Sequence, residues 1–185
     1  RVKPDCSFFG LCGGCELQHM SYTEQLNVKR EMIISAMIAG GLSRSLDEKV
    51  RAVIGGSPYS YRQRVLLHCD DSGHIGFYQT QSRSVVEITN CSIATAAISD
   101  SINRLREIAS VLKGRISTID IENDEKGLIF VFIAKQPLDW SEIKEITEGA
   151  KSRFESFTIK FGTDELASVG RKTISLPILH GSQTV

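Results

Sequence analysis

Four of the five cysteines in the sequence are placed where they could bind one metal centre. Three of them fall within ten residues in the pattern Cys-x5-Cys-Gly-Gly-Cys, and the fourth follows much later in the chain. Thiolate sulfur is the preferred ligand of iron–sulfur clusters, and a 4Fe–4S cluster takes four thiolates. The paired glycines remove side-chain bulk and let backbone N–H groups approach cluster sulfurs. We therefore expect one metal centre, preferably a 4Fe–4S cluster, with the ligands Cys6, Cys12, Cys15 and Cys91.

Other roles for these cysteines remain open. A structural zinc site uses the same thiolates, although zinc ligands usually come as two close pairs and the fourth cysteine here is single. Disulfides are disfavoured in a reducing compartment, and a nucleophilic cysteine would need a base that is not nearby in sequence. An electron-transfer protein is disfavoured because two-cluster ferredoxins need more cysteines in tighter runs. The fifth cysteine, Cys69, lies in an apolar run, and we expect it to be buried without a role.

The elements that position the cysteines follow from apolar periodicity and turn residues. Residues 1–19 are Gly- and Cys-rich and are expected to form a cluster-binding loop, and residues 20–185 a central α+β domain. Ser21 and Glu24 match a capping box, and Gly114 stands where a helix would end. Helices are predicted over about 22–39, 94–113 and 140–151. Strands are predicted over about 50–54, 62–69, 74–80, 84–88, 116–121, 128–134 and 157–161, with an irregular tail from residue 163.

The fold class predicted from these elements is α+β. We expect a small mixed or antiparallel sheet, about three helices, and a cysteine-rich N-terminal arm that carries the metal cluster. The arm must fold back toward Cys91, because the fourth ligand lies within the domain.

Composition and charge limit the classes of partner. The chain is 41% hydrophobic and 24% charged, which is ordinary for a globular protein of 185 residues. Its net charge is zero, with nine Lys/Arg against six Asp/Glu in residues 1–64, so any RNA contact must be local. No apolar run approaches the length of a membrane span, and the first residues show no secretory signal. We expect a cytoplasmic monomer without membrane contact.

Several motifs resemble the iron–sulfur-containing SAM-dependent RNA (uracil-5-)-methyltransferase family. The segment from Cys6 to His19 resembles that family's cluster loop, and Cys91 matches its fourth cluster ligand. Further matches are Tyr22, Gln25, Leu26 and Lys29 in the following helix, Tyr61-Arg62-Gln63-Arg64, Gly76-Phe77-Tyr78, and Ser82-Arg83. Gln63 departs from the Asn that the family has in this strand. The resemblance covers about residues 4–95 well, and from about 96 to 185 it rests on the order of elements.

The resemblance implies that the chain is the central domain of such an enzyme. Members often add an N-terminal OB-like TRAM domain and a C-terminal Rossmann-like domain that binds SAM and catalyses. In this family an enzyme cysteine attacks C6 of uracil, C5 takes the methyl group from SAM, and a base removes the C5 proton. The chain shows no Gly-rich SAM loop and no match to those catalytic residues, so we assign no catalytic or SAM-binding residue. We expect it to be inactive alone and to position rRNA or tRNA for methylation of a uridine.

Candidate RNA contacts gather around one predicted strand. Arg62 and Arg64 alternate along it and so face the same side, and Arg83 follows on a neighbouring segment. Tyr61 and Phe77 offer surfaces on which bases can stack. The competing interpretation of these residues is a solvated polar strand face. For the whole chain, the competing function is a non-enzymatic RNA-binding module with a structural Zn(Cys)4 site.

Overall fold

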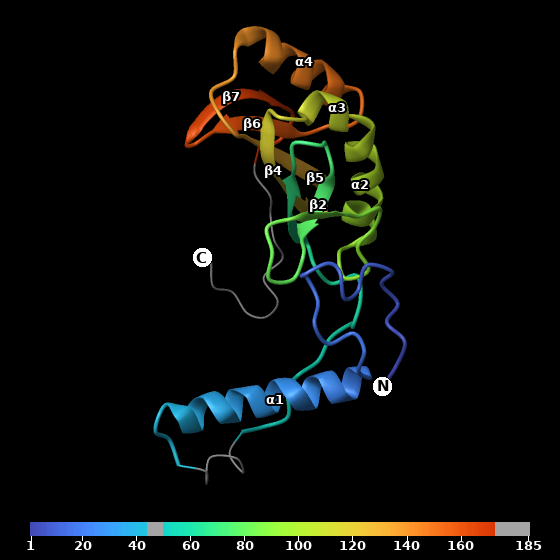
Figure 1. Ribbon diagram of the computed structural model, residues 1–185, viewed down its shortest axis with the longest axis vertical. Coiled ribbons are helices and arrows are strands. Elements are labelled where there is room, and N and C mark those ends of the chain that lie inside the picture. The colour runs from blue at the N-terminus through green and yellow to red at the C-terminus, as the bar shows by residue number, and fades with distance from the viewer. Residues whose placement is uncertain (44–49, 173–185) are drawn as a thin grey trace.

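The chain forms a seven-stranded sheet with helices packed on it, and a long helix that stands apart from the sheet (Figure 1). The computed structural model describes residues 1–43 and 50–172. The helices are α1 (Tyr22–Ala39), α2 (Ala96–Glu107), α3 (Ala109–Leu112) and α4 (Trp140–Lys151). The strands are β1 (Arg64–Cys69), β2 (Ile75–Tyr78), β3 (Val85–Glu87), β4 (Ile116–Asp124), β5 (Gly127–Ala134), β6 (Phe157–Phe161) and β7 (Asp164–Val169). None of the helices described has the length and apolar character needed to cross a membrane.

The sheet is mixed, with the strand order β3-β2-β1-β4-β5-β6-β7. All neighbouring strands are antiparallel except β5 and β6, which are parallel and joined through α4. The pairing of Ile119 with Phe132 and of Ile121 with Phe130 places large apolar side chains on one face. Because residues two apart in a strand share a face, this register defines the side that the helices cover.

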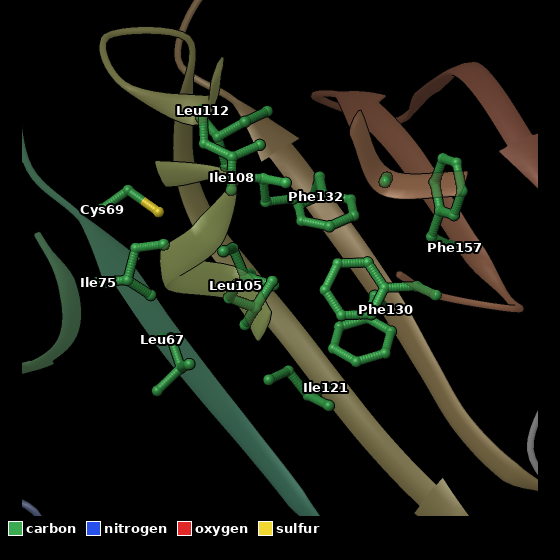
Figure 2. Close-up of a cluster of buried hydrophobic side chains, with 14 of the residues drawn as sticks. Leu67, Cys69, Ile75, Leu105, Ile108, Leu112, Ile121, Phe130, Phe132 and Phe157 are labelled. Carbon is green, nitrogen blue, oxygen red and sulfur yellow. The ribbon is translucent and has the colours of Figure 1, made fainter. Parts of the chain in front are cut away.

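The core lies between that face and the helices. Figure 2 shows Leu105, Ile108 and Leu112 from the helical segment beside side chains of the central strands. Leu105 and Phe132 are fully buried, and Phe130 is nearly so. Burying an apolar side chain of this size contributes about 1.5–3 kcal/mol, so this packing holds the sheet and helices together without help from a metal.

Helix α1 is held by hydrogen bonds near its first turn and, midway along it, by Arg30, whose guanidinium donates to the Val50 carbonyl. Its first turn is capped by Ser21, whose Oγ accepts a hydrogen bond from the backbone N–H of Glu24 at 3.3 Å. Near the same end, the Tyr22 hydroxyl accepts from the backbone N–H of Gly56 at 2.9 Å. Met32 is 63% exposed, and Ile34 is the only buried side chain of the helix. The helix therefore extends from the cysteine loop without joining the core (Figure 1).

The structure confirms most predicted elements and corrects others. The helices predicted over 22–39 and 140–151 and the strand over 157–161 are confirmed. The helix predicted over 94–113 is two helices, α2 and α3, separated at Ile108. The strand predicted over 50–54 is wrong, because residues 50–54 form no strand and Ile54 is 98% exposed.

The predicted irregular tail is also wrong in its first part. Strand β7 pairs antiparallel with β6 after a turn at Gly162, whose φ of +57° favours glycine. The described residues thus form seven strands, as many as predicted but with β7 in place of residues 50–54, and four helices instead of about three. The rest of the predicted tail, residues 173–185, lies outside the described residues.

Candidate metal centre

The four predicted ligands line one pocket. The N-terminal loop folds back between α1 and the sheet (Figure 1), and this brings it against the segment that follows β3. The pocket between them is lined by Cys6, Cys12, Cys15 and Cys91, together with the apolar side chains Phe8, Phe9, Phe77, Ile88 and Ile93. Residues separated by more than seventy positions in sequence are therefore neighbours in space, as the cysteine spacing predicts.

Backbone hydrogen bonds dock the loop on the end of β2. The Gly13 N–H donates to the Tyr78 carbonyl at 2.9 Å, and Cys12 forms a β-bridge with Gln79. A Cβ atom at Gly13 would lie 3.0 Å from the Tyr78 oxygen and 3.3 Å from the Thr80 nitrogen. Since both are backbone atoms, they cannot move aside as a flexible side chain would. Glycine at this position is what lets the loop approach the strand so closely.

Cys91 is fixed from two sides. Its backbone N–H donates to the Ser99 hydroxyl in the first turn of α2 at 3.0 Å. Two residues further on, the Ile93 carbonyl accepts from the Arg62 backbone N–H at 2.8 Å. The distant ligand is therefore held by the same element, α2, that packs into the core.

The thiols interact electrostatically. Burial raises the pKa of Cys12; the Gly14 N–H, which donates to its Sγ at 3.4 Å, opposes this effect, and the other three thiols add to it. Burial also raises the pKa of Cys15, and hydrogen bonding from Gln18 and the charge of Arg62 act in the opposite direction. Four thiolates so placed repel one another unless a cation lies between them, which is the condition that metal binding satisfies.

The kind of donor limits which metal centre the pocket fits. Among the described residues, no group of three or more His, Cys, Asp and Glu side chains is arranged to hold a metal ion. The four cysteines nevertheless line one pocket in the described part of the chain. The all-thiolate donor set is the one that a 4Fe–4S cluster requires, and a structural Zn(Cys)4 ion takes the same donors.

The candidate RNA contacts do not form one surface. Arg62 and Phe77 line the cysteine pocket instead of facing outward. Arg64 is ion-paired with Asp120 and Glu122 across the sheet. Tyr61 and the Arg64 side chain are 55% and 66% exposed, and Arg83 is exposed in the turn between β2 and β3.

A groove beside the metal pocket was not predicted. It has a volume of about 540 Å³ and runs between α1, the cysteine loop and the segment before β1. Tyr61 lines it, and so do Tyr22, Tyr59 and Lys29. The aromatic residues are scattered through the sequence, so no local pattern identifies the groove.

Gln18 is the other residue that the sequence does not single out. Its side chain is almost fully buried and lines the cysteine pocket. It follows Cys15 by three positions in a loop without periodicity, so its burial becomes visible only once the loop has been folded.

Comparison with known proteins gives relatives of one kind. No family model matches the chain. It is 30% identical over 148 residues to an uncharacterized RNA methyltransferase of Bacillus anthracis, covering 78% of this chain and 31% of that protein. It is 37% identical over 131 residues to an uncharacterized RNA methyltransferase of Clostridium tetani, covering 69% of this chain and 27% of that protein. The 23S rRNA (uracil(1939)-C(5))-methyltransferase RlmD of Shewanella amazonensis is 29% identical over 176 residues, covering 90% of this chain and 39% of that protein.

The fold is shared with a solved structure. It is the tRNA (uracil-54, C5)-methyltransferase of Pyrococcus abyssi in complex with S-adenosyl-L-homocysteine, with a TM-score of 0.64 and 20% sequence identity. The match covers 88% of this chain and 42% of that chain. The chain thus spans about a third of the length of the curated relatives it matches.

Proposed function

Because the chain belongs to the RNA (uracil-5-)-methyltransferase family and spans about a third of its curated relatives, we propose that it is the central domain of such an enzyme. In this proposal the domain holds a 4Fe–4S cluster and positions RNA. The whole enzyme transfers a methyl group from SAM to C5 of a uridine in rRNA or tRNA, in the cytoplasm. The SAM-binding and catalytic residues belong to a further domain of the enzyme, and this chain alone is inactive.

The observation that carries the metal assignment is the meeting of four cysteines in one pocket. Cys6, Cys12 and Cys15 come from the N-terminal loop, and Cys91 comes from the segment between β3 and α2. When bound, the cluster would supply four iron–thiolate bonds that cross-link the loop to the domain. Because ligands gathered this way exist only in the folded chain, binding of the cluster adds to the free energy of unfolding.

The RNA-positioning role is supported by the surface near the pocket. Tyr61 and Arg83 are exposed, and the groove beside the loop offers Tyr59 and Lys29 as further contacts. Stacking on aromatic rings and charge contacts with phosphate are the usual means of holding single-stranded RNA. Flipping a uridine out of its stack costs a few kcal/mol, and a domain that binds the surrounding strand offsets that cost.

The metal assignment is tested by replacing one predicted ligand and, in a separate control variant, the cysteine that is not a predicted ligand. Cys91→Ser is expected to lose iron and sulfide and to lower the melting temperature, because the loop is no longer cross-linked to α2. Cys69→Ala is the control, since Cys69 is buried in the core away from the pocket. It should keep the full cluster content even if it loses about 1 kcal/mol of stability from the small cavity. If Cys91→Ser keeps the wild-type iron content and melting curve, the ligand assignment is wrong.

The competing zinc-binding module makes a different prediction for the same samples. It requires one zinc per chain and no sulfide. The family to which the chain belongs disfavours the non-enzymatic part of this alternative.

A further inference from the structure

Gln18 is a buried polar residue in the wall of the cysteine pocket. It is 7% exposed, and the described residues contain few other polar side chains that are as well buried. Burial of an amide without hydrogen bonds costs about 1–3 kcal/mol, so a residue of this kind needs partners. Its neighbours in the pocket include all four cysteines.

The Gln18 carboxamide lies against the ligand loop. Its Oε1 atom accepts a hydrogen bond from the backbone N–H of Cys6 at 3.4 Å. The other end of the carboxamide is a donor, and Gln18 lines the same pocket as the Cys15 thiol. One side chain thus binds the first cysteine of the motif and lies in the pocket of the third, nine positions later.

The backbone around Gln18 holds it in place. The Met20 N–H donates to the Leu17 carbonyl at 3.0 Å, which closes a turn around the glutamine. The next residue, His19, packs its ring against Phe9 at 5.8 Å between centroids. The carboxamide is therefore anchored at the point where the chain leaves the pocket and enters α1.

We propose that Gln18 is a positioning residue for the metal centre, which sets the distance between Cys6 and Cys15 and presents an N–H group to the Cys15 sulfur. This inference rests on the proposed cluster. Hydrogen bonds to ligand sulfurs stabilise the more negative, reduced form of an iron–sulfur cluster and raise its reduction potential. Residues that orient ligands from outside the coordination sphere typically change metal affinity by about 10–100-fold when replaced.

Two substitutions separate the contacts. Gln18→Leu removes the acceptor for the Cys6 N–H and the N–H donor at similar volume. Gln18→Glu keeps an acceptor for the Cys6 N–H, but it removes the donor to Cys15 and adds negative charge. Gln25→Leu is the matched control, because Gln25 is also a partly buried glutamine and its Nε2 donates to the Met20 carbonyl outside the cysteine pocket.

The measurements use anaerobically purified protein reconstituted with ferrous iron and sulfide. Both Gln18 variants should lower the reduction potential of the cluster, and Gln18→Leu should release iron to a chelator about tenfold faster than the wild type. Gln25→Leu should match the wild type in both. If Gln18→Leu does not fold, the potential of Gln18→Glu alone carries the test.

A second readout does not need the cluster. In metal-free protein the Cys6 amide should exchange with solvent faster in Gln18→Leu than in the wild type or Gln18→Glu, because only leucine lacks the acceptor. The inference would be overturned if the Gln18 variants had the reduction potential, iron-release rate and Cys6 amide exchange of the wild type. It would also be overturned if Gln25→Leu changed these quantities as much as Gln18→Leu does. Failure of the wild type to bind iron and sulfide would instead refute the proposed cluster, and amide exchange would then decide whether Gln18 orders the loop.

Discussion

The Nε atom of Arg64 lies 3.0 Å from Oδ1 of Asp120, across the pairing of β1 with β4. The same guanidinium reaches Glu122, also at 3.0 Å. Asp120 is almost fully buried, whereas the Arg64 side chain is 66% exposed. An arginine that sequence reasoning favours as an RNA contact therefore serves first to neutralise a carboxylate that would otherwise be buried without a partner.

This pairing predicts a measurable coupling. Arg64→Gln and Asp120→Asn should each destabilise the fold, and the double variant should lose less than the sum of the two. We expect a coupling energy of about 0.5–1 kcal/mol, because the exposed arginine is screened by solvent. Urea unfolding of the four proteins measures it. Strictly additive losses would show that the pair contributes nothing to stability.

RNA binding should depend on Arg83 more than on Arg64. Arg83→Gln is expected to weaken binding of single-stranded RNA and to lower the salt slope by about one unit, as loss of one phosphate contact does. Arg64→Gln should change the slope less, because its charge is already paired. Lys144→Gln is the control, since Lys144 is exposed on α4, at the opposite end of the molecule from α1 (Figure 1). Titrations of the full-length protein at several salt concentrations test this, and an unchanged slope for Arg83→Gln would contradict it.

The docking of the loop on β2 should be sensitive to one methyl group. Gly13→Ala places a Cβ against the backbone at Tyr78 and Thr80, so the loop must shift away from the strand. We expect a loss of about 1–3 kcal/mol, as in other overpacked sites, and a lower cluster content. Gly56→Ala is the control, because a Cβ there would meet no atom within 4 Å. Equal iron content and melting temperatures for the two variants would refute the close approach.

Stability should fall as the solution is acidified, in part because of His68. Burial lowers the pKa of His68, its Nδ1 has no hydrogen-bond partner among the described residues, and its ring stacks on Tyr78 at 3.7 Å. The unfolded chain therefore takes up a proton more readily than the folded one. The contribution of neutral His68 to the free energy of unfolding is fully present above its unfolded pKa of about 6.5. This contribution is lost as the pH falls from that value toward the lower pKa of the folded state.

The variant His68→Phe isolates this contribution. Phenylalanine keeps the stacking on Tyr78 but cannot be protonated, so the variant should lose less stability than the wild type between about pH 7 and 5. Chemical unfolding at a series of pH values measures the difference. The same pH dependence in both proteins would show that His68 does not contribute.

Helix caps and apolar periodicity predict the elements whose bounds depend on residues close together in the sequence. The capping residue Ser21 and the periodicity behind it predict α1 with the bounds that the structure shows. Residues 50–54 are apolar enough to predict a strand, but Ile54 packs against nothing and is almost fully exposed, so no sheet recruits them. Strand β7 was missed because its burial does not alternate and its pairing with β6 follows from a turn at Gly162.

The candidate site also has a part that the sequence predicts and a part that it does not. The cysteine ligands could be predicted because thiolate chemistry restricts which residues bind a cluster, whatever their distance in the chain. Two other features could not be predicted, because both depend on strand register: the placement of Arg62 beside Cys15 and the pairing of Arg64 with Asp120. A one-residue change of register would exchange the two faces, and a sequence pattern alone does not fix it.

The central claim is that the four cysteines hold an iron–sulfur cluster. Its most direct test is the content of iron and acid-labile sulfide in anaerobically purified protein, measured with the visible spectrum. We predict about four of each per chain, with a broad brown absorption that dithionite bleaches. Stoichiometric zinc without sulfide would contradict the claim.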